Sequence, residues 1–533
     1  MSLSRRHALQ LALATASVPA AATPHTAAGV EGQRRADLGN GTYLNPIVAG
    51  DHADPTILKD RADYWMTFSS FQSYPGAVLW HSTDLLNWTP VTAALTENIG
   101  TVWAMDLVKH AGRYYLYIPV LQDAGTGIYV IHASDIRGPW SAPIDLKIPG
   151  CIDPGHAVGE DGRRYLFVNG GRRVRLRDDG LATDGPLEAH AWQPWQYPKD
   201  WVVEMFAPEG PKLLRRGEWF YLVSAVGGTA GPPTSHMVTV ARSRSIHGPW
   251  VHCPHNPIVR TTSADEPWWS RGHASLVEGP SGDPGDWWMV YHGYENGFRT
   301  LGRQALLEPV EWTKDGWPRA KGGTLARPLP APRGGRRGPA GVPLSDDFAQ
   351  PRMGTQWSFH APGPDELQRL HWEGGSLALR GKGKSLADCS PLVCINGDRR
   401  YECSVDVEIA GDGHAGLGLF YDERGHVGLG FSPTQRLTYG YGQEHAWMRE
   451  ALPPLTAGTT RRVRIQLTNR DHVLTFRYSL DAGATWVQHP WQMEVSGLHH
   501  NVFGGFVSLR IALFSAGAGE ARFRHFTYRG LPA

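Results

Sequence analysis

The sequence has almost no net charge. Its 52 Lys and Arg residues balance 51 Asp and Glu residues, which leaves a formal charge of +1 over 533 residues. Without a surface field of one sign, we expect no nucleic-acid partner and no attraction to an anionic membrane. A chain of this length should fold as two or more domains, because single hydrophobic cores stop growing beyond about 250 to 300 residues.

Cysteine is also scarce, and its spacing matches no metal site. An odd number of cysteines leaves at least one unpaired, so no disulfide framework is expected. Cys389 and Cys394 are close enough in sequence to pair in an oxidising compartment, while free buried thiols are an equally good interpretation. The five residues are Cys151, Cys253, Cys389, Cys394 and Cys403.

No apolar run is long enough for a comfortable membrane span. The nearest candidate follows Arg5 and Arg6, ends at Val18 and is succeeded by the small residues Ala20–Ala22. This is the shape of an export signal, and the paired arginines favour the twin-arginine route. We therefore expect residues 1–22 to be removed and the protein to act in the periplasm or outside the cell; a retained anchor is the alternative.

Aromatic residues are abundant, with 21 Trp and 18 Tyr, and a short aromatic pattern recurs. A turn, two or three aromatics and then Leu or Met appear five times, at spacings of 50, 50, 56 and 67 residues. Units of several short strands at this period predict an all-β, five-bladed β-propeller over residues 43–320. The anchor positions are Trp65, Tyr115, Tyr165, Tyr221 and Trp288.

The composition changes after the fifth unit. Residues 321–344 are rich in Pro, Gly and Arg without apolar periodicity, which indicates an exposed linker. Beyond it, apolar residues alternate with polar ones, as at Val463, Ile465 and Leu467. Residues 345–533 are therefore predicted to form an antiparallel β-sandwich. No helix of convincing length is expected after the export signal.

Three acidic residues occupy equivalent places in three units. Asp54, Asp153 and Glu209 lie 11, 12 and 12 residues before their anchors, and a proline follows each closely. Equivalent positions of propeller blades converge on the axis, where Trp103 of the second unit and His273 of the fifth should also lie. Asp-Pro is a common turn dipeptide, but three acids in register favour a functional site.

Carboxylates gathered in a partly dry funnel should not all ionise, so at least one pKa is expected to rise. Cleavage of a glycosidic bond needs this arrangement: one protonated carboxyl at the leaving oxygen and one ionised carboxylate on the opposite face of the sugar. Flat aromatic rings with a polar edge suit sugars as well, although all-β proteins also use them to fill strands.

Six short motifs resemble glycoside hydrolase family 43, in the order that this family has them. They are Asn-Pro-Ile at 45–47, Ala-Asp-Pro-Thr-Ile at 53–57, Trp-Ala-Met-Asp-Leu at 103–107, Cys-Ile-Asp-Pro at 151–154, Ala-Pro-Glu-Gly-Pro at 207–211 and Gly-Arg-Gln at 302–304. The resemblance implies a five-bladed propeller and an inverting enzyme, in most members a β-xylosidase, an α-L-arabinofuranosidase or an arabinanase and in a few a galactosidase.

The resemblance also implies roles for the three acids. Asp54 matches the general base that activates water, Glu209 the general acid, and Asp153 the residue that raises the acid's pKa and holds it. Inversion implies that the Asp54 and Glu209 carboxyls lie about 6.5 to 9.5 Å apart, which leaves room for the water.

Four further residues match the family's substrate pocket. Phe71 and Trp103 resemble aromatics that wall the first sugar site, although each is equally interpretable as core. Arg303 resembles an arginine that reaches sugar hydroxyls. His273 resembles an axial histidine that in some members coordinates calcium through water, so Ca²⁺ is an option, although no cofactor is expected to be required.

Two departures leave the sugar open between xylose and arabinose. Met105 stands where the family usually has Pro, and Gln304 where it usually has Glu. The C-terminal part, through residues 416–421, 513–515 and 523–528, resembles the concanavalin-like sandwich of many family β-xylosidases. A sandwich loop that closes the pocket would imply an exo-acting enzyme; an independent carbohydrate-binding module is the competing interpretation.

The alternatives differ in chemistry. Fructan and sucrose hydrolases also use three acids on a propeller, but Ile152 before the second acid and Gly210 after the third do not match their patterns. A non-catalytic carbohydrate-binding propeller is a second alternative, and a family member acting on arabinan or galactan is a third. In every case the expected partner is an oligosaccharide or polysaccharide.

Overall fold

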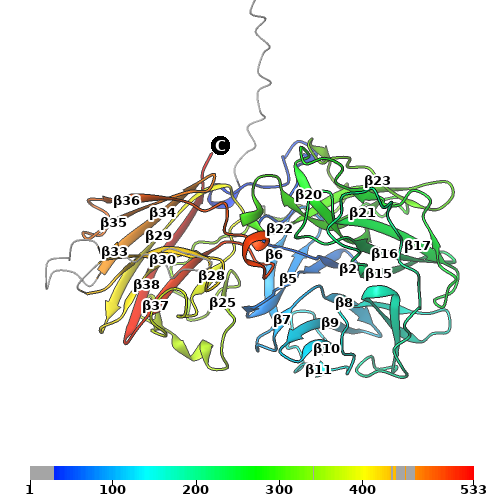
Figure 1. Cartoon of the computed structure of the whole chain (residues 1–533), viewed down its shortest axis with the longest axis horizontal. Coiled ribbons are helices and arrows are strands. Elements are labelled where there is room, and N and C mark those ends of the chain that lie inside the picture. The colour runs from blue at the N-terminus through cyan, green and yellow to red at the C-terminus, as the bar shows by residue number, and fades with distance from the viewer. Residues whose placement is uncertain (1–28, 340, 434–435, 440–449, 452–461, 533) are drawn as a thin grey trace, which may run out of the picture.

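The computed structural model describes residues 29–339, 341–433, 436–439, 450–451 and 462–532. A propeller and a sandwich lie side by side, at the right and left of Figure 1. The predicted export signal, residues 1–22, lies outside the described residues. Among the residues described, no helix combines the length and the apolarity needed to cross a bilayer.

Five antiparallel sheets form the propeller, so the predicted five-bladed fold is confirmed. Blade one has β2 (Thr56–Asp60), β3 (Asp63–Thr67), β5 (Gly76–Ser82) and β6 (Thr89–Leu95). Blade two has β7 (Thr101–Val102), β8 (Asp106–His110), β9 (Arg113–Gln122), β10 (Gly125–Ala133) and β11 (Ile144–Asp145). Blade three has β12 (Gly155–Val158), β13 (Arg164–Val168) and β14 (Arg172–Leu176).

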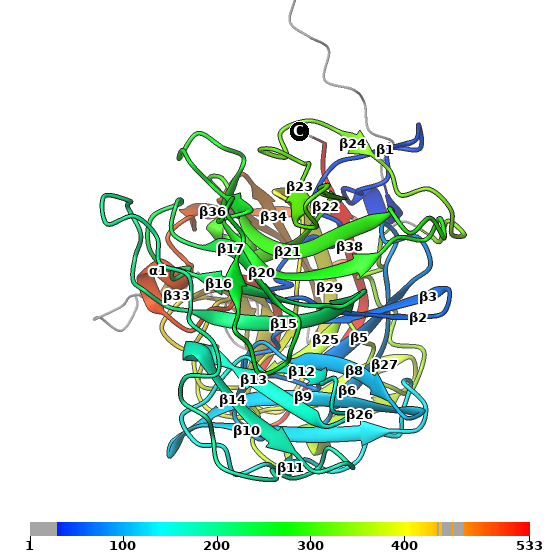
Figure 2. The same ribbon diagram turned by 90° about the vertical axis from the view of Figure 1, so that its right-hand side faces the viewer.

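The last two blades continue in chain order. Blade four has β15 (Glu209–Arg216), β16 (Trp219–Val226), β17 (Met237–Ser243), β18 (Val251–His252) and β19 (Val259–Arg260). Blade five has β20 (Trp268–Glu278), β21 (Trp287–Glu295), β22 (Arg303–Trp312) and β23 (Pro318–Ala320). Figure 2 turns the propeller toward the viewer, with blade five above and blade two below.

The aromatic anchors explain why the blades form and pack. Each anchor lies in a strand that is paired on both sides, namely β3, β9, β13, β16 or β21. Trp65 is 3% exposed and packs in one cluster with Leu116 and Ile131 of the next blade. Large flat side chains thus fill the wedges between blades, which is why the aromatic pattern marks this fold.

The predicted linker is mostly exposed, but part of it takes part in the propeller. Its β24 (Leu329–Pro330) pairs with β1 (Thr42–Tyr43), the first strand of the described chain. The Tyr43 hydroxyl donates to the Leu307 carbonyl of blade five at 2.8 Å. The two ends of the propeller chain are therefore held together at blade five.

The second domain is the predicted antiparallel sandwich of two sheets. One sheet contains β25 (Trp357–His360), β28 (Leu392–Cys394), β30 (His414–Phe420), β31 (His426–Phe431), β32 (Arg436–Tyr439), β33 (Glu450–Ala451) and β37 (Arg510–Ala516). The other contains β26 (Leu370–Glu373), β27 (Ser376–Arg380), β29 (Arg400–Ala410), β34 (Arg462–Arg470), β35 (Val473–Ser479), β36 (Val487–Glu494) and β38 (Glu520–Gly530). Val463, Ile465 and Leu467 face the core between them and are at most 2% exposed.

Helices are few in the described ranges, as expected. They are α1 (His500–Phe503) and the 3₁₀ turns η1 (Val30–Gly32), η2 (Asn169–Gly171), η3 (Arg299–Leu301) and η4 (Glu366–Arg369). All five cysteines are buried and unpaired, so the interpretation as free thiols holds and the Cys389–Cys394 pairing does not form.

The sandwich is joined to the propeller by backbone pairing. β25 of the sandwich pairs with β4 (Ser73–Tyr74), which lies two residues after Phe71 in blade one. The Leu509 N–H donates to the Thr300 carbonyl at 2.8 Å. Hydrogen-bonded strands resist sliding, so this junction holds the sandwich at a defined position beside the propeller axis.

The sandwich core yields a stability prediction. Leu417 in β30 is fully buried, so Leu417→Ala should lower the free energy of unfolding by about 3 kcal/mol through lost contacts and a cavity. Leu367→Ala is the control, since Leu367 is 46% exposed. Urea denaturation followed by circular dichroism measures both variants. Equal effects would contradict the packing described.

Candidate active site

One pocket of about 230 Å³ at the propeller axis brings together all seven residues that the sequence singled out. Asp54 and Asp153 lie just before β2 and β12, Glu209 begins β15, Trp103 lies between β7 and β8, and His273 lies within β20. The first strand of a propeller blade is the one nearest the axis. The seven residues in the pocket are Asp54, Phe71, Trp103, Asp153, Glu209, His273 and Arg303.

The backbone of this site is held in an uncommon conformation. Asp54 and Asp153 both have φ of 56°, in the left-handed region, and each is followed by a proline. Asp tolerates this region better than most residues, and such strain persists only where the surroundings impose it. The same conformation on two blades shows that the two acids are structurally equivalent.

Two side-chain donors reach the Asp54 carboxylate. Arg303 Nη1 donates to its Oδ1 at 2.8 Å, and the Ser69 hydroxyl donates to its Oδ2 at 2.6 Å. The backbone N–H of Asp54 in turn donates to His292 Nδ1 at 3.1 Å. Burial opposes ionisation, yet the Arg303 guanidinium holds the pKa of Asp54 well below its usual range. This carboxylate is therefore ionised at neutral pH.

The other two acids have the opposite electrostatics. Burial, and after it the charge of Asp54, raises the pKa of Asp153 to about 7. Burial and the charge of Asp153 raise the pKa of Glu209 well above its ordinary value. The Asp153 Oδ2 accepts the Gly210 N–H at 3.1 Å, which fixes the backbone beside Glu209. The Glu209 side chain is 23% exposed, so it reaches the open pocket.

Asp106, which follows Trp103 closely in sequence, takes no part in the pocket. Its Oδ1 accepts from Lys212 Nζ at 2.9 Å, and its Oδ2 accepts the His156 N–H at 2.7 Å. Both Lys212 and Asp106 are buried. The nearby Lys212 charge opposes the rise in the pKa of Asp153 that burial causes.

The sandwich contributes one wall of the pocket through Phe506. Its ring is stacked on Phe71 with centroids 6.3 Å apart, and the Arg303 guanidinium lies 5.6 Å from the Phe71 centroid and 5.3 Å from that of Phe506. Phe506 lies far from the propeller in sequence and in no motif, so no sequence signal marked it. The interpretation in which a sandwich loop closes the pocket is the one that the structure supports.

Sequence reasoning also missed a fourth carboxylate, Glu204. It lines the pocket, and its Oε2 accepts the N–H groups of Ala230 and Gly231 at 2.9 and 2.8 Å. These two bonds hold the opposite wall of the pocket in place. Glu204 stands in a loop without a recognisable motif, and only the fold brings it near Glu209.

Two more histidines lie behind the acids. His236 is stacked on His292 with centroids 5.2 Å apart, and His273 lies 6.0 Å from His292. One ligand atom each of Glu209, His236 and His273 falls within 4.8 Å of the others. Two imidazoles and one carboxylate suit zinc-like ions, whereas calcium prefers oxygen ligands. These residues therefore do not fit direct calcium coordination.

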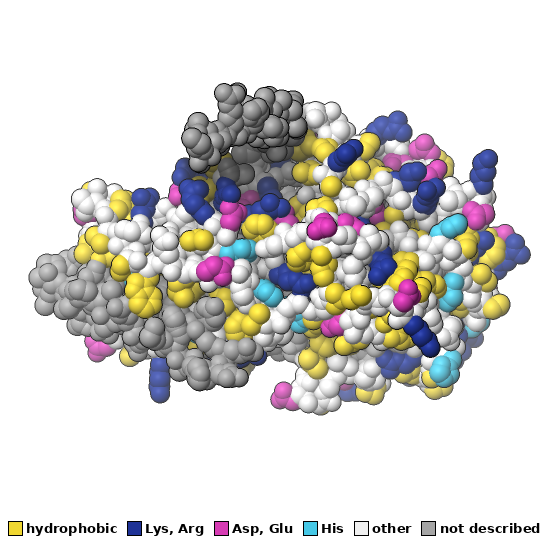
Figure 3. All heavy atoms as spheres, turned by 45° about the horizontal axis from the view of Figure 1, so that its top comes forward, with side chains coloured by type: hydrophobic (Ala, Val, Ile, Leu, Met, Phe, Trp, Pro, Cys, Tyr) yellow, Lys and Arg dark blue, Asp and Glu magenta, His cyan; other side chains and the backbone are white. Residues whose placement is uncertain are grey.

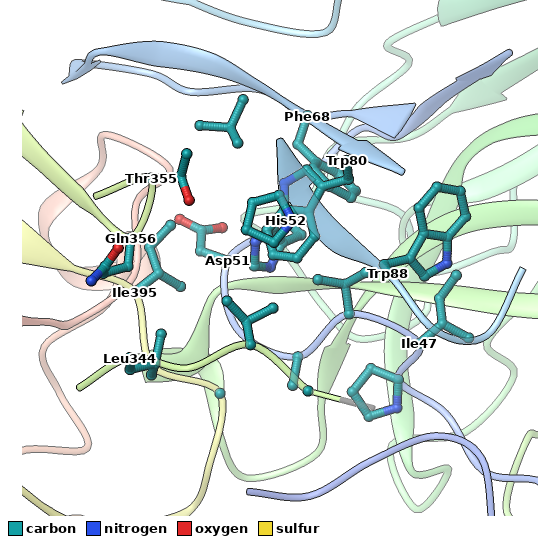
Figure 4. Close-up of a pocket in the computed structure, with 18 of the residues that line it drawn as sticks. Ile47, Asp51, His52, Phe68, Trp80, Trp88, Leu344, Thr355, Gln356 and Ile395 are labelled. Atoms are coloured by element: carbon teal, nitrogen blue, oxygen red, sulfur yellow. The ribbon is translucent and has the colours of Figure 1, made fainter. Parts of the chain in front are cut away.

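A second cavity, of about 170 Å³, lies between the propeller and the sandwich (Figure 4). Its aromatic wall is made by Phe68, Trp80 and Trp88, and the His52 ring packs 5.0 Å from Trp80. Burial raises the pKa of Asp51 in this cavity to about 7. The three acids lie in the axial pocket instead, which makes that pocket the candidate active site.

Two family models match the chain. The model described as glycosyl hydrolases family 43 matches residues 43–318, and the beta xylosidase C-terminal concanavalin A-like domain matches residues 345–529. A xylan 1,3-beta-xylosidase of a Vibrio species is 27% identical over 91% of this chain and 99% of its own length. A non-reducing end alpha-L-arabinofuranosidase of Bacteroides ovatus is 26% identical over 91% and 93%.

Solved structures agree with these matches over both domains. A family 43 protein of Bacillus licheniformis superposes with a TM-score of 0.80 at 25% identity, covering 92% of this chain and all of its own. A xylan beta-1,4-xylosidase of Bacillus halodurans superposes with a TM-score of 0.78 at 25% identity, covering 91% and 99%.

The raised pKa of Asp153 predicts a pH-dependent stability. A carboxyl whose folded pKa is raised stabilises the fold below its ordinary pKa of 3.8, and that contribution is lost as pH rises toward about 7. Asp153→Asn should therefore stabilise the protein at pH 8, by up to about 4 kcal/mol, and far less at pH 4. Calorimetric melting at both pH values measures the difference. An equal shift at both would contradict the raised pKa.

Proposed function

This chain belongs to glycosyl hydrolases family 43 and is therefore a glycosidase, and we propose that it is an inverting, exo-acting one. The proposed products are terminal xylose or arabinose, released from xylan-type oligosaccharides and polysaccharides. Relatives named for each activity match at similar identity. Because the family is one of enzymes, the alternative of a non-catalytic carbohydrate-binding propeller is excluded.

The observation that carries this proposal is the split electrostatics of one pocket. Asp54 is held ionised by Arg303, while burial and Asp153 favour a protonated Glu209. A base and an acid in opposite protonation states at the same pH are what single-displacement hydrolysis requires. Asp153 also has a raised pKa, but it is buried, whereas the Glu209 side chain is 23% exposed and reaches the open pocket.

In the proposed reaction, Asp54 removes a proton from a water molecule as that water attacks the anomeric carbon. Glu209 donates its proton to the oxygen of the departing group, so one bond to the anomeric carbon forms while the other breaks. Asp153 keeps Glu209 protonated through its own charge and positions it through the Gly210 N–H. Exchange with solvent then returns one proton to Glu209 and removes one from Asp54.

The pocket walls support an exo-acting enzyme. Phe506 of the sandwich is stacked on Phe71 of the propeller, and both rings lie beside Arg303, whose planar donors suit the hydroxyls of a terminal sugar. A cavity of about 230 Å³ with a wall from each domain suits one sugar at a chain end. A long polysaccharide would need an open groove instead.

The first test compares nitrophenyl β-xyloside with nitrophenyl α-arabinofuranoside and follows the released sugar by proton NMR. We expect turnover of at least one of the two substrates, with the anomer opposite to the substrate's forming first. A product of unchanged anomeric configuration would contradict inversion. Turnover of neither pentoside, with hydrolysis of arabinan or galactan, would redirect the substrate assignment.

Variants of the two acids separate their roles. Asp54→Ala should lower kcat about a thousandfold or more on every substrate, because the base is needed whatever leaves. Glu209→Ala should lose as much on an oligosaccharide but far less on a dinitrophenyl glycoside, whose leaving group needs no proton. Asp63→Ala is the matched control, since Asp63 is half exposed at the turn between β2 and β3. Equal losses for both variants on both substrates would contradict the roles.

We further propose that the reaction requires no metal. The donors near Glu209 do not fit direct calcium coordination, although His273 could still hold calcium through water. Dialysis against EDTA should leave kcat/KM within about twofold of its starting value, since no step passes through an ion. A loss that Ca²⁺ restores would support the water-mediated site.

Export to the periplasm or beyond is proposed from residues 1–22 alone.

A further inference from the structure

The two aspartates of the pocket share a backbone conformation but differ in their electrostatics. Asp54 and Asp153 both have φ of 56° and both lie just before the first long strand of their blades. Burial raises the pKa of Asp153 to about 7, whereas the Arg303 guanidinium holds the pKa of Asp54 well below its usual range. Charges of both signs are interspersed on the face seen in Figure 3, so a surface field of one sign does not separate the two acids. The difference comes from the groups next to each acid.

One loop residue occupies the same place beside each of these aspartates. The Ser69 N–H donates to the Ala53 carbonyl at 3.1 Å, and the Asn169 N–H donates to the Ile152 carbonyl at 3.2 Å. In each case the accepting carbonyl belongs to the residue directly before the acid. Both donors follow the end of the second long strand of their blade, β3 or β13, within two residues. Ser69 and Asn169 are therefore structurally equivalent.

The side chains at these equivalent positions have different partners. The Ser69 hydroxyl donates to Asp54 Oδ2 at 2.6 Å. The Asn169 Oδ1 instead accepts the Ile152 N–H at 3.0 Å and Arg172 Nη2 at 2.6 Å. A hydrogen bond donated to an ionised carboxylate favours its charged form. The hydroxyl in blade one therefore supports a charge on its aspartate, while the amide oxygen in blade three is used on the backbone and on an arginine.

Ser69 and Arg303 bind opposite oxygens of the Asp54 carboxylate. Arg303 Nη1 donates to Oδ1 at 2.8 Å, and Ser69 donates to Oδ2. Ser69 is 6% exposed and Arg303 5%, so the protein interior holds both donors. Two donors on opposite oxygens stop the carboxylate from rotating and determine which lone pairs remain for a water molecule. Of the described residues that line the axial pocket, Arg303 is one and Ser69 is not. Ser69 therefore contacts the acid without facing the substrate.

We propose that Ser69 is a positioning residue for the base, whose hydroxyl keeps the Asp54 carboxylate ionised and oriented toward the attacking water. The inference rests on the proposed function, because it takes Asp54 as the base. It adds that the base needs donors from two blades, Arg303 from blade five and Ser69 from blade one. The side chain at the position shared by Ser69 and Asn169 thus helps to separate the roles of two equivalent aspartates.

The test compares Ser69→Ala with Ser70→Ala on the nitrophenyl pentoside that the wild-type protein hydrolyses. Ser69→Ala removes a hydrogen bond to a charged group, so kcat should fall about tenfold or more, while KM should stay within about twofold because Ser69 does not line the pocket. Ser70 is the matched control, since its buried hydroxyl has no hydrogen-bond partner among the described residues. Ser70→Ala should leave both constants unchanged. Ser69→Thr keeps the hydroxyl and should restore most of the lost kcat.

A double variant separates an effect on the base from a general change in the fold. Asp54→Ala removes the carboxylate, so adding Ser69→Ala to it should change the residual kcat by less than about twofold. A dinitrophenyl pentoside, whose leaving group departs readily, keeps this residual rate measurable.

Three results would overturn the role of Ser69: an unchanged kcat in Ser69→Ala, an equal loss in Ser70→Ala, or a further loss of the same size in the Asp54→Ala background. The last result would mean that Ser69 acts on something other than the base. If Asp54→Ala itself kept the wild-type kcat, the proposed function would fail instead.

Discussion

The active site depends on one ion pair in a dry place, between Arg303 and Asp54. Both side chains are at most 7% exposed, and the guanidinium donates to the carboxylate at 2.8 Å. Burial raises the pKa of a carboxylate, and the pKa values of Asp153 and Glu209 are both raised. The single guanidinium therefore makes Asp54 the most readily ionised of the three acids, and its removal would reduce the difference between the proposed base and the proposed acid.

The propeller is what allows this concentration of acids. Each acid stands at the inner end of a separate blade, so the sheets hold the three carboxyls at the axis through independent hydrogen-bonded ladders. The left-handed backbone at Asp54 and Asp153 costs about 1 kcal/mol or more at each residue. That strain is borne by blades whose wedges are filled with aromatic rings such as Trp65, and the burial there is large enough to offset it.

The parts of this structure that were predictable from sequence are those with a period. The aromatic anchors recur with each blade and the apolar residues of the sandwich alternate, so fold, blade number and the position of each acid relative to its anchor followed from spacing. Phe506 and Glu204 have no such period, because they reach the pocket from another domain and from an irregular loop. The axial histidines were predictable only in part. The sequence pointed to His273, but not to His236 and His292, whose rings lie next to it.

The sandwich is better understood as part of the active site than as an appendage. β25 adds a strand to β4 directly after Phe71, and Leu509 bonds to Thr300 just before Arg303. The sandwich is therefore bonded to the two propeller segments that carry Phe71 and Arg303, the side chains beside which Phe506 lies. Because the sandwich is bonded to these segments, Phe506 should keep its distance from Phe71 and Arg303 even if the domains shift slightly. The junction between the domains therefore closes one side of the pocket. The exo-acting proposal thus rests on how the two domains are joined and not on one loop alone.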